Sequence, residues 1–497
     1  MITGQVHRAV PAIASLNATP LELTGEFCDG PGGERTVLDG LCVRQDTFGT
    51  SRGKPVALVS ATSVSPHPAS PHPMTRPGYS LALLAFLSTA SLQAENWPQW
   101  RGASHDGISK ETNVPTRWTA SDGVAWRLKL PGRAGATPVV WNDSIFLTSV
   151  GEDNDTLLLM CVGTDGKVRW TRELGKGNKD ARVNEGNSAS PSPVTDGKYV
   201  WTFLGNGPLS CHDFDGKEIW KFDVQDRYGK LNIQFGMTSS PLLDGDRLYL
   251  QLIHGEGDPK TREAKIVCLD KTTGKELWKA ERPSEAHSEN EHSYASPTIY
   301  RDGQRAYLLT HGADWIIAHD LTDGHELWRS AGLQPDKYDP TLRLVASPVA
   351  VPGLIVAPSA KGGRVIALTP DGSGDITGSK HKLWEYTPTP DVPSPLIHNG
   401  LVYLYRENGV LVVLDAKTGK KLYEQRTPGE NNRASPVFAN GNIYLVSRNG
   451  ITTVVKAGPK FEEVSTNALE EITTASPVIS NGRIYIRTYE SLWAIGK

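Results

Sequence analysis

The sequence lacks the motifs by which common catalytic centres are recognised. It contains no G-x-S-x-G, no HExxH and no Gly-rich phosphate loop that opens a helix. Its five cysteines include no adjacent pair, and no CxxCH motif for haem attachment is present. The residues alone therefore nominate no catalytic group and no metal site.

Strong charge and long apolar runs are also missing. The formal net charge is −3, which gives no electrostatic reason to expect nucleic acid or an anionic membrane as a partner. The apolar run near the N-terminus, Tyr79–Leu87, is much shorter than the ~20 residues that cross a bilayer. The mature chain is thus predicted to have no transmembrane segment. Turn-forming residues are abundant instead, with 49 Gly and 34 Pro.

The N-terminal region differs from the rest of the chain. Residues 1–73 show no amphipathic period and end in a Pro-rich stretch, Ser60–Pro73. Met74 is followed by a basic residue, the apolar run and small residues up to Ala94, which is the order of a secretory signal. We expect translation to start at Met74, residues 1–73 not to belong to the native protein, and residues 74–94 to be a signal peptide. The alternative is a buried helix in a larger N-terminal domain.

Cleavage is expected after Ala94 or Ala90, which would export the protein to the periplasm or outside the cell. No cysteine lies near either site, so a lipid-anchored N-terminus is not expected.

A short phrase, small residue–Pro–two apolar residues, recurs eight times in residues 95–497, at spacings of 41 to 56 residues. Its prolines are Pro138, Pro193, Pro241, Pro297, Pro348, Pro395, Pro436 and Pro477. Each phrase leads through an Asn-Gly or similar hairpin turn to a second apolar segment. A third segment then ends in an apolar–x–small–x–Asp pattern and leads through a turn, Thr-Gly-Lys in the clearest copies, to an aromatic residue. Four short strands per repeat predict one all-β domain, an eight-bladed β-propeller of four-stranded antiparallel blades.

The recurrent aromatic residue near the outer end of each repeat offers a large surface to wedge between blades. These predicted docking aromatics are Trp126, Trp170, Trp220, Trp278, Trp328, Trp384 and Tyr423. The chain ends in Ser491–Lys497, a third-strand pattern without its outer strand. Gly123–Pro131 matches that missing strand, so the N- and C-terminal strands are predicted to pair in one blade and close the ring.

The copies of L-D-x-x-T-G-K-x-x-W, clearest in Ile266–Trp278, resemble the tryptophan-docking repeat of alcohol dehydrogenases that depend on pyrroloquinoline quinone (PQQ). They equally resemble the non-enzymatic PQQ-like propellers, including the propeller subunit of the outer-membrane barrel-assembly machinery. The opening segment Glu95–Ser109 also looks like the start of mature PQQ-like repeat proteins. The resemblance spans residues 95–497 and implies the fold more strongly than the function.

The resemblance implies requirements for an enzyme that this sequence does not meet. The PQQ alcohol dehydrogenases carry two adjacent cysteines under the quinone and a Glu–Asn–Asp set for calcium and the catalytic base. Here Cys161, Cys211 and Cys268 stand alone at equivalent repeat positions, where other repeats have Ala or Val. We expect them to be buried packing residues, too far apart for a disulfide. No cofactor is therefore expected, and PQQ with calcium is the alternative.

Loops that join an outer strand to the next inner strand are expected to share one face of the propeller. Three long polar loops are residues 176–190, 281–296 and 334–347, and two shorter ones are residues 230–240 and 428–435. Convergent polar groups at a funnel are a default hypothesis for a binding site. The candidates for ligand binding are Asn184, Glu185, Gln234, Glu291, His292, Arg343, Asn432 and Arg433. The alternative is that they are solvated loop residues.

The remaining polar and aromatic residues give weaker evidence for a site, or are expected to have structural roles. The loop at Ala286–His292 holds two His and two Glu residues, but its spacing matches no standard metal site. Trp315 and Tyr338 are stacking candidates for a sugar. The histidines at 254, 311 and 319, the Ser-Pro serines, and the turn residues Asp270 and Asp415 are expected to serve packing and turns.

The sequence thus favours an exported, monomeric, non-catalytic scaffold that binds a protein, a small ligand or a glycan. A divergent PQQ-dependent oxidoreductase acting on alcohols or sugars and a carbohydrate-recognition propeller are the alternatives.

Overall fold

The computed structural model describes residues 95–181, 185–256 and 263–497. The chain divides into two units, Met1–Leu87 and Ser88–Lys497, and all described residues belong to the second. The predicted upstream segment and signal peptide lie outside the described residues.

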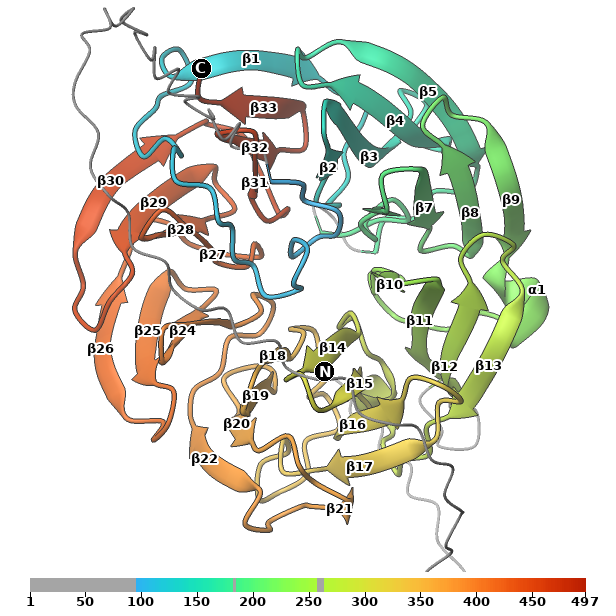
Figure 1. Cartoon of the computed structure of the whole chain (residues 1–497), viewed down its shortest axis with the longest axis vertical. Coiled ribbons are helices and arrows are strands. Elements are labelled where there is room, and N and C mark those ends of the chain that lie inside the picture. Colours follow the sequence, from blue (N-terminus) through green and yellow to red (C-terminus); the bar gives the residue numbers. More distant parts are fainter. Residues whose placement is uncertain (1–94, 182–184, 257–262) are drawn as a thin grey trace, which may run out of the picture. The chain divides into compact units, whose positions relative to one another are not determined.

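Eight sheets follow one another around a central axis (Figure 1), which confirms the eight-bladed β-propeller. Seven have four strands, and one has a short fifth strand. The first four blades consist of β2 (Val139–Trp141), β3 (Ser144–Val150), β4 (Leu157–Gly163) and β5 (Val168–Gly175); β6 (Val194–Thr195), β7 (Tyr199–Phe203), β8 (Pro208–Asp213) and β9 (Glu218–Asp223); β10 (Leu242–Asp244), β11 (Arg247–His254), β12 (Glu263–Asp270) and β13 (Glu276–Glu281); and β14 (Thr298–Arg301), β15 (Ala306–Gly312), β16 (Trp315–Asp320) and β17 (Glu326–Ser330) with β21 (Gly374–Asp375).

The last four blades complete the ring. They consist of β18 (Val349–Val351), β19 (Leu354–Pro358), β20 (Val365–Leu368) and β22 (Lys382–Tyr386); β23 (Leu396–His398), β24 (Leu401–Tyr405), β25 (Val410–Asp415) and β26 (Lys421–Arg426); β27 (Val437–Ala439), β28 (Asn442–Val446), β29 (Ile451–Lys456) and β30 (Glu463–Ala468); and β31 (Val478–Ser480), β32 (Arg483–Arg487) and β33 (Ser491–Ile495) with β1 (Val124–Lys129).

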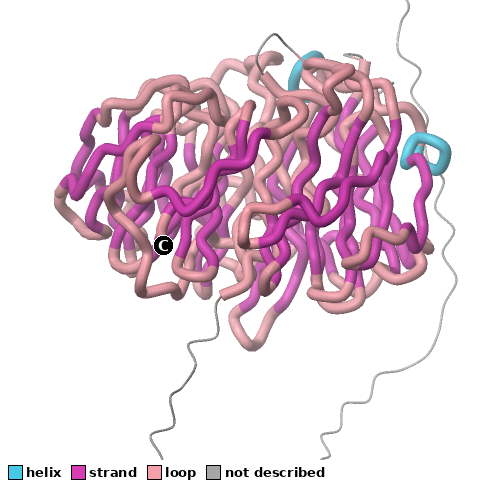
Figure 2. Tube along the Cα trace, turned by 90° about the horizontal axis from the view of Figure 1, so that it is seen from above, coloured by secondary structure: helices cyan, strands magenta, loops and turns pink. Residues whose placement is uncertain are grey.

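Helices are few and short in the described part of the chain. They are α1 (Val224–Tyr228) and the 3-10 helix η1 (Ser288–Glu291). None of the described helices has the length and apolar character needed to cross a membrane. In the side view, the strands run between two layers of loops (Figure 2).

The recurring proline precedes the innermost strand of every blade. In each repeat, the strand begins at the residue directly after the proline, as at Pro297 and Thr298. Proline cannot donate a ladder hydrogen bond, so the position just before a strand is one that it can occupy. The innermost strands of neighbouring blades contact one another and form the wall around the axis.

The hydroxyl residue before each proline joins neighbouring blades in a closed ring of hydrogen bonds. Ser296 N donates to Ser347 Oγ at 2.9 Å, and Ser347 N donates to Ser394 Oγ at 2.9 Å. The ring closes where Ser476 N donates to Thr137 Oγ1 at 3.2 Å. The remaining links are Thr137 N to Ser192, Ser192 N to Ser240, Ser240 N to Ser296, Ser394 N to Ser435 and Ser435 N to Ser476. The structural interpretation of the Ser-Pro serines is confirmed.

Substitution of one ring serine by alanine should destabilise the protein measurably. In Ser347→Ala, the buried Ser296 N–H loses its acceptor, at a cost of about 1–3 kcal/mol. Ser347→Thr keeps a hydroxyl, as Thr137 does in the first blade, and should cost less. Urea denaturation of both variants measures the difference. Equal stability of the two would mean that the hydroxyl acceptor contributes nothing.

Strand β1 completes the last blade, which confirms the predicted ring closure. It pairs antiparallel with β33, and Arg127 lies opposite Trp493 in the register. The C-terminal strand edge is thereby covered by a strand from the beginning of the described chain. The last blade thereby has four strands like its neighbours, and β33 is not left as its outer edge.

Five of the predicted docking tryptophans contact the next blade in the same way. The Trp278 indole N–H donates to Leu321 O at 3.2 Å, and its ring lies against Gly324. The same pair of contacts joins Trp126, Trp170, Trp220 and Trp384 to the turns of the blades that follow them. Trp328 packs against Gly372 and Tyr307, and Tyr423 packs against Phe461.

The three cysteines are buried and free, as predicted. Each lies opposite a docking tryptophan in the adjacent strand, Cys268 opposite Trp278 for example, and Ala318 takes the same register opposite Trp328. Burial raises the pKa of the Cys161 thiol to about 11 and that of Cys268 to about 12. These thiols therefore act as small packing groups.

The turn of the L-D-x-x-T-G-K phrase has the predicted cap. Asp270 Oδ1 accepts hydrogen bonds from the backbone N–H groups of Thr272 and Thr273, and Asp415 Oδ1 accepts one from Thr418 N. Both carboxylates are thus occupied by their own turns.

The segment that begins at Glu95 crosses the axis (Figure 1). The Gln99 side-chain amide exchanges two hydrogen bonds with the backbone of Leu243 in the third blade. Arg101 donates to Pro395 O in the sixth blade at 2.8 Å. Because the segment is attached to blades on both sides of the ring, it lies across one end of the central channel.

Candidate binding funnel

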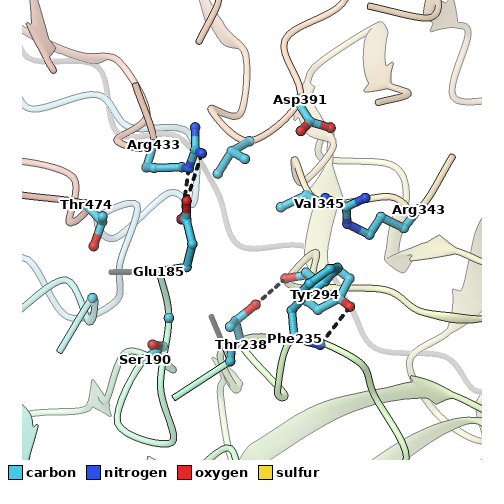
Figure 3. A pocket seen from close by; sticks show the side chains of 14 residues that line it. Glu185, Ser190, Phe235, Thr238, Tyr294, Arg343, Val345, Asp391, Arg433 and Thr474 are labelled. Atoms are coloured by element: carbon cyan, nitrogen blue, oxygen red, sulfur yellow. Dashed lines mark hydrogen bonds and ion pairs between the residues drawn. The ribbon is translucent and has the colours of Figure 1, made fainter. Parts of the chain in front are cut away.

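A cavity of about 230 Å³ opens where the long loops meet (Figure 3). All five loops that the sequence analysis selected contribute to its wall. The lining residues are Gly135, Ala181, Glu185, Gly186, Ser190, Phe235, Thr238, Tyr294, Arg343, Val345, Asp391, Val392, Arg433 and Thr474. We call this cavity the funnel.

A second cavity, of about 140 Å³, shares part of this wall and is lined by all eight hydroxyl groups of the ring. Trp100 also lines it. We call this cavity the channel. The funnel therefore leads to the hydroxyl ring, with Trp100 from the crossing segment beside it.

One repeat position lines both cavities in every blade. It lies two residues before the ring hydroxyl and is occupied by Gly135, Ser190, Thr238, Tyr294, Val345, Val392, Arg433 and Thr474. We call these eight residues the neck. Arg433 is its one charged residue, and Tyr294 is its one aromatic residue. The position two residues before each Ser-Pro or Thr-Pro can be found from the repeat spacing in the sequence. A search for polar residues in long loops does not find it, because several neck residues are apolar or small.

Three of the eight predicted site residues line the funnel: Glu185, Arg343 and Arg433. Gln234 is exposed next to Phe235 and lies outside the wall. Asn184 lies outside the described residues.

The other three predicted residues are buried and do not line the funnel. Glu291 has no exposed surface, and its neighbour His292 has its Nε2 atom 3.0 Å from Gly255 O. The Asn432 amide donates to Arg406 O at 2.8 Å and so holds a loop. The polarity of a loop residue alone could not show whether its side chain is buried within the protein or lines the cavity.

Glu185 is shared by two arginines. Arg433 donates to both of its carboxylate oxygens, at 3.1 and 3.3 Å, and Arg448 donates to one of them at 2.9 Å. Burial acts to raise the pKa of Glu185, but the hydrogen bonds and charges of the two arginines outweigh it and leave the pKa below its ordinary value. Glu185 is thus held as a carboxylate, and this cluster carries one excess positive charge.

A second cluster, again of one carboxylate and two cations, lies at Arg343. Its guanidinium donates to Glu289 Oε2 at 2.9 Å, and Lys361 Nζ lies 3.5 Å from the same oxygen. The Arg343 guanidinium also lies over the Phe235 ring, 4.9 Å from its centroid. Stacking and ion pairing together fix this arginine at the wall of the funnel.

Two aromatic side chains that sequence reasoning missed complete the wall. The Tyr294 hydroxyl accepts a hydrogen bond from Phe235 N at 3.3 Å, and Tyr294 O accepts one from Thr238 Oγ1 at 3.4 Å (Figure 3). Burial raises the pKa of the Tyr294 phenol, which therefore remains a hydrogen-bond donor at neutral pH.

The sequence matches the family model described as outer membrane protein assembly factor BamB, over residues 205–380 and 377–496. These segments together span more than half of the chain. The chain belongs to this family.

Solved structures agree on the fold of this BamB-family protein. BamB from Moraxella catarrhalis is 15% identical and has a TM-score of 0.54, covering 75% of this chain and 99% of its own. A europium-containing methanol dehydrogenase is 12% identical, with a TM-score of 0.61 and coverage of 80% and 90%. The quinohemoprotein alcohol dehydrogenase ADHIIG from Pseudomonas putida HK5 is 12% identical, with a TM-score of 0.56 and coverage of 81% and 80%. No curated protein matches the sequence. Identities this low establish the fold alone.

The funnel residues do not fit the calcium–quinone arrangement of the dehydrogenases. Of the carboxylates at the wall, Glu185 is held by two arginines, and Asp391 Oδ1 accepts a hydrogen bond from Lys361 N at 3.0 Å. In residues 95–497, apart from the two undescribed gaps, three His, Cys, Asp or Glu side chains come close enough to share a metal ion only at Asp320, Asp323 and His325. That cluster belongs to the turn after β16 and lines neither cavity.

None of the remaining candidates lines the funnel. Around η1, the carboxylate of Glu289 binds Arg343, while Glu291 and His292 are buried, so the His and Glu residues of this loop form no common ligand set. Tyr338 stacks on His287 at 4.8 Å, and Arg329 covers Trp315 at 4.9 Å. Neither stacking candidate lines the funnel.

Proposed function

We propose that this BamB-family propeller is an exported, non-catalytic binding protein that serves assembly in the bacterial cell envelope. Two observations support the location and role: the predicted signal peptide, and a family named for outer-membrane protein assembly. A rigid disk with loops gathered on one face is suited to presenting a fixed surface to a partner. In this proposal the protein acts as a monomer and without a bound quinone.

The composition of the funnel is the observation on which the proposal depends most. Its wall offers arginines, aromatic rings and hydroxyl groups that bind, while its carboxylates are already engaged by arginine or backbone groups. A general base needs an available proton acceptor within hydrogen-bond reach of the substrate. Such a wall favours recognition over proton transfer.

Titration with PQQ and calcium tests this proposal against the oxidoreductase alternative. We expect no saturable change in quinone absorbance and no rise in melting temperature, because Glu185 is held by two arginines and Asp391 Oδ1 by a backbone N–H, rather than being arranged to share a calcium ion. A quinoprotein dehydrogenase reconstituted in parallel controls for active cofactor. Stoichiometric PQQ binding with thermal stabilisation would overturn the non-catalytic assignment and justify assays with alcohols and aldoses.

A partner test addresses the assembly role. The tagged protein and its Arg343→Gln variant would be crosslinked in envelope preparations of the producing cells. If the loop face binds the partner, the variant should lose the crosslinked product while keeping its melting temperature. Retention of the same product by the variant would place the interaction elsewhere on the disk and contradict a funnel-face scaffold.

A further inference from the structure

The eight ring hydroxyls are donors without acceptors. Each oxygen accepts one backbone N–H from a neighbouring blade, and in the described chain no protein acceptor receives the hydrogen of any of the eight hydroxyl groups. All eight residues are more than nine-tenths buried, and all line the channel. Buried donors of this kind require an acceptor from water or from a ligand.

The charges around the funnel leave an excess of cations. Arg343 and Lys361 share Glu289, Arg433 and Arg448 share Glu185, and the remaining wall carboxylate is Asp391. Among the described residues, four cations thus accompany three carboxylates around the funnel. A guanidinium has five N–H donors, so Arg343 and Arg433 keep donors for a bound group after their ion pairs are made.

The neck is asymmetric although the fold is repetitive. Seven of its eight positions are uncharged, and Arg433 alone brings a charge next to the hydroxyl ring. Tyr294, at another neck position, offers an aromatic ring and a phenol donor, and the ring centroid of Phe235 lies 6.2 Å from its own. The funnel therefore offers a positively charged side at which an anion can bind, aromatic side chains that provide apolar surface, and many uncharged hydrogen-bond donors.

We propose that the funnel binds a small hydroxy-carboxylate of about the size of a monosaccharide acid. Its carboxylate pairs with Arg433 and Arg343, and its hydroxyl oxygens accept from the ring hydroxyls at the neck, where the funnel meets the channel. Its C–H face lies on Tyr294 and Phe235. A cavity of about 230 Å³ has room for one such ring. The inference rests on the proposed binding function, because it names a ligand class for the same site.

The test uses D-glucuronate as the probe and D-glucose as its neutral counterpart, titrated into the purified protein by calorimetry at low salt. Glucuronate should bind at least tenfold more tightly than glucose, and its affinity should fall as salt rises. Arg433→Gln should weaken glucuronate binding at least tenfold. Arg448→Gln is the matched control, because it also removes an arginine that pairs with Glu185. Arg448 does not line the cavity, so the loss of glucuronate affinity should stay within threefold.

A second variant, Arg343→Gln, keeps the test valid if Arg433→Gln does not fold. Arg343→Gln should also weaken glucuronate binding by several-fold, and the melting temperature of each variant verifies its fold. Equal binding of glucose and glucuronate, or unchanged glucuronate affinity in Arg433→Gln, would overturn the inference. Absence of glucuronate binding together with absence of PQQ binding would overturn this inference but leave the proposed non-catalytic scaffold intact. PQQ binding with calcium would overturn the proposed function itself.

Discussion

Lowering the pH from 7 to 5 is expected to reduce the free energy of unfolding by several kcal/mol. Three fully buried histidines contribute to this loss, together with His105, whose pKa is also lowered to about 4 by burial. Burial lowers the pKa of His254 and His319 to about 4 and that of His311 to about 3, from 6.5. The unfolded chain therefore binds protons that the folded chain excludes, and each histidine removes about 2 kcal/mol over this interval.

The direction of the pH effect on stability depends on whether the folded or the unfolded state binds more protons. Between the folded and unfolded pKa values, the unfolded state carries more protons, so stability falls as the pH falls and levels off only below about pH 3 to 4. Glu407 acts in the opposite direction, because burial raises the pKa of its carboxyl. Urea denaturation at pH 7, 6 and 5 measures the net effect.

A single histidine can be isolated. His319 has Nδ1 3.0 Å from Gly324 O and Nε2 3.0 Å from Thr310 Oγ1. His319→Gln should lower stability at pH 7 and make the loss between pH 7 and 5 about 2 kcal/mol smaller. His325→Gln is the control, because this histidine is exposed and its pKa is raised by Asp323, so the acid loss should not become smaller. Constant stability from pH 7 to 5 would contradict the burial of neutral histidines.

The second large effect concerns the contact between blades. In Gly324→Ala, the new Cβ would lie 2.4 Å from the ring of Trp278, and the backbone at Gly324 has φ +80°. Both the left-handed conformation and the collision are unfavourable, so we expect a loss of about 2–4 kcal/mol in the free energy of unfolding. Chemical denaturation measures it.

Gly303→Ala is the matched control within the same blade. Gly303 has φ +85°, but no atom lies within 4 Å of the position that an added Cβ would take, so only the backbone strain remains. Its cost should be about 1–2 kcal/mol. Combining Gly324→Ala with Trp278→Ala should remove the collision and make the alanine at 324 cost no more than that at 303. Equal costs of the two single variants would mean that Trp278 does not dock on this glycine.

Much of the fold could be predicted because each of the eight repeats carries short motifs that favour one backbone conformation. Proline before an inner strand, Asn-Gly in hairpins and Asp-x-x-Thr-Gly in turns each have one favourable backbone solution, so their spacing reveals the blades. The same logic predicted closure by β1, because the last repeat lacks an outer strand and Trp126 stands in a matching pattern. The buried cysteines could be predicted for the same reason, as each occupies a position that holds Ala or Val in other repeats.

The candidate site was predictable only in part. Long polar loops correctly indicated Glu185, Arg343 and Arg433 at the funnel, but Glu291 and Asn432 have equal polarity and turn inward. Phe235 and Tyr294 gave no polar signal at all. Whether a loop residue faces the cavity depends on the path of its own loop and on its neighbours from other blades.

The sequence by itself determined the repeat, the number of blades, the ring closure and the hydroxyl residue before each proline, because these depend on local backbone preferences. The tertiary structure alone decided that those hydroxyls join in one hydrogen-bonded ring, that Glu185 is shared by Arg433 and Arg448, and that Arg343 lies over Phe235. These contacts join residues that are far apart in the chain. They arise only when eight blades close around one axis and bring their loops to a common point.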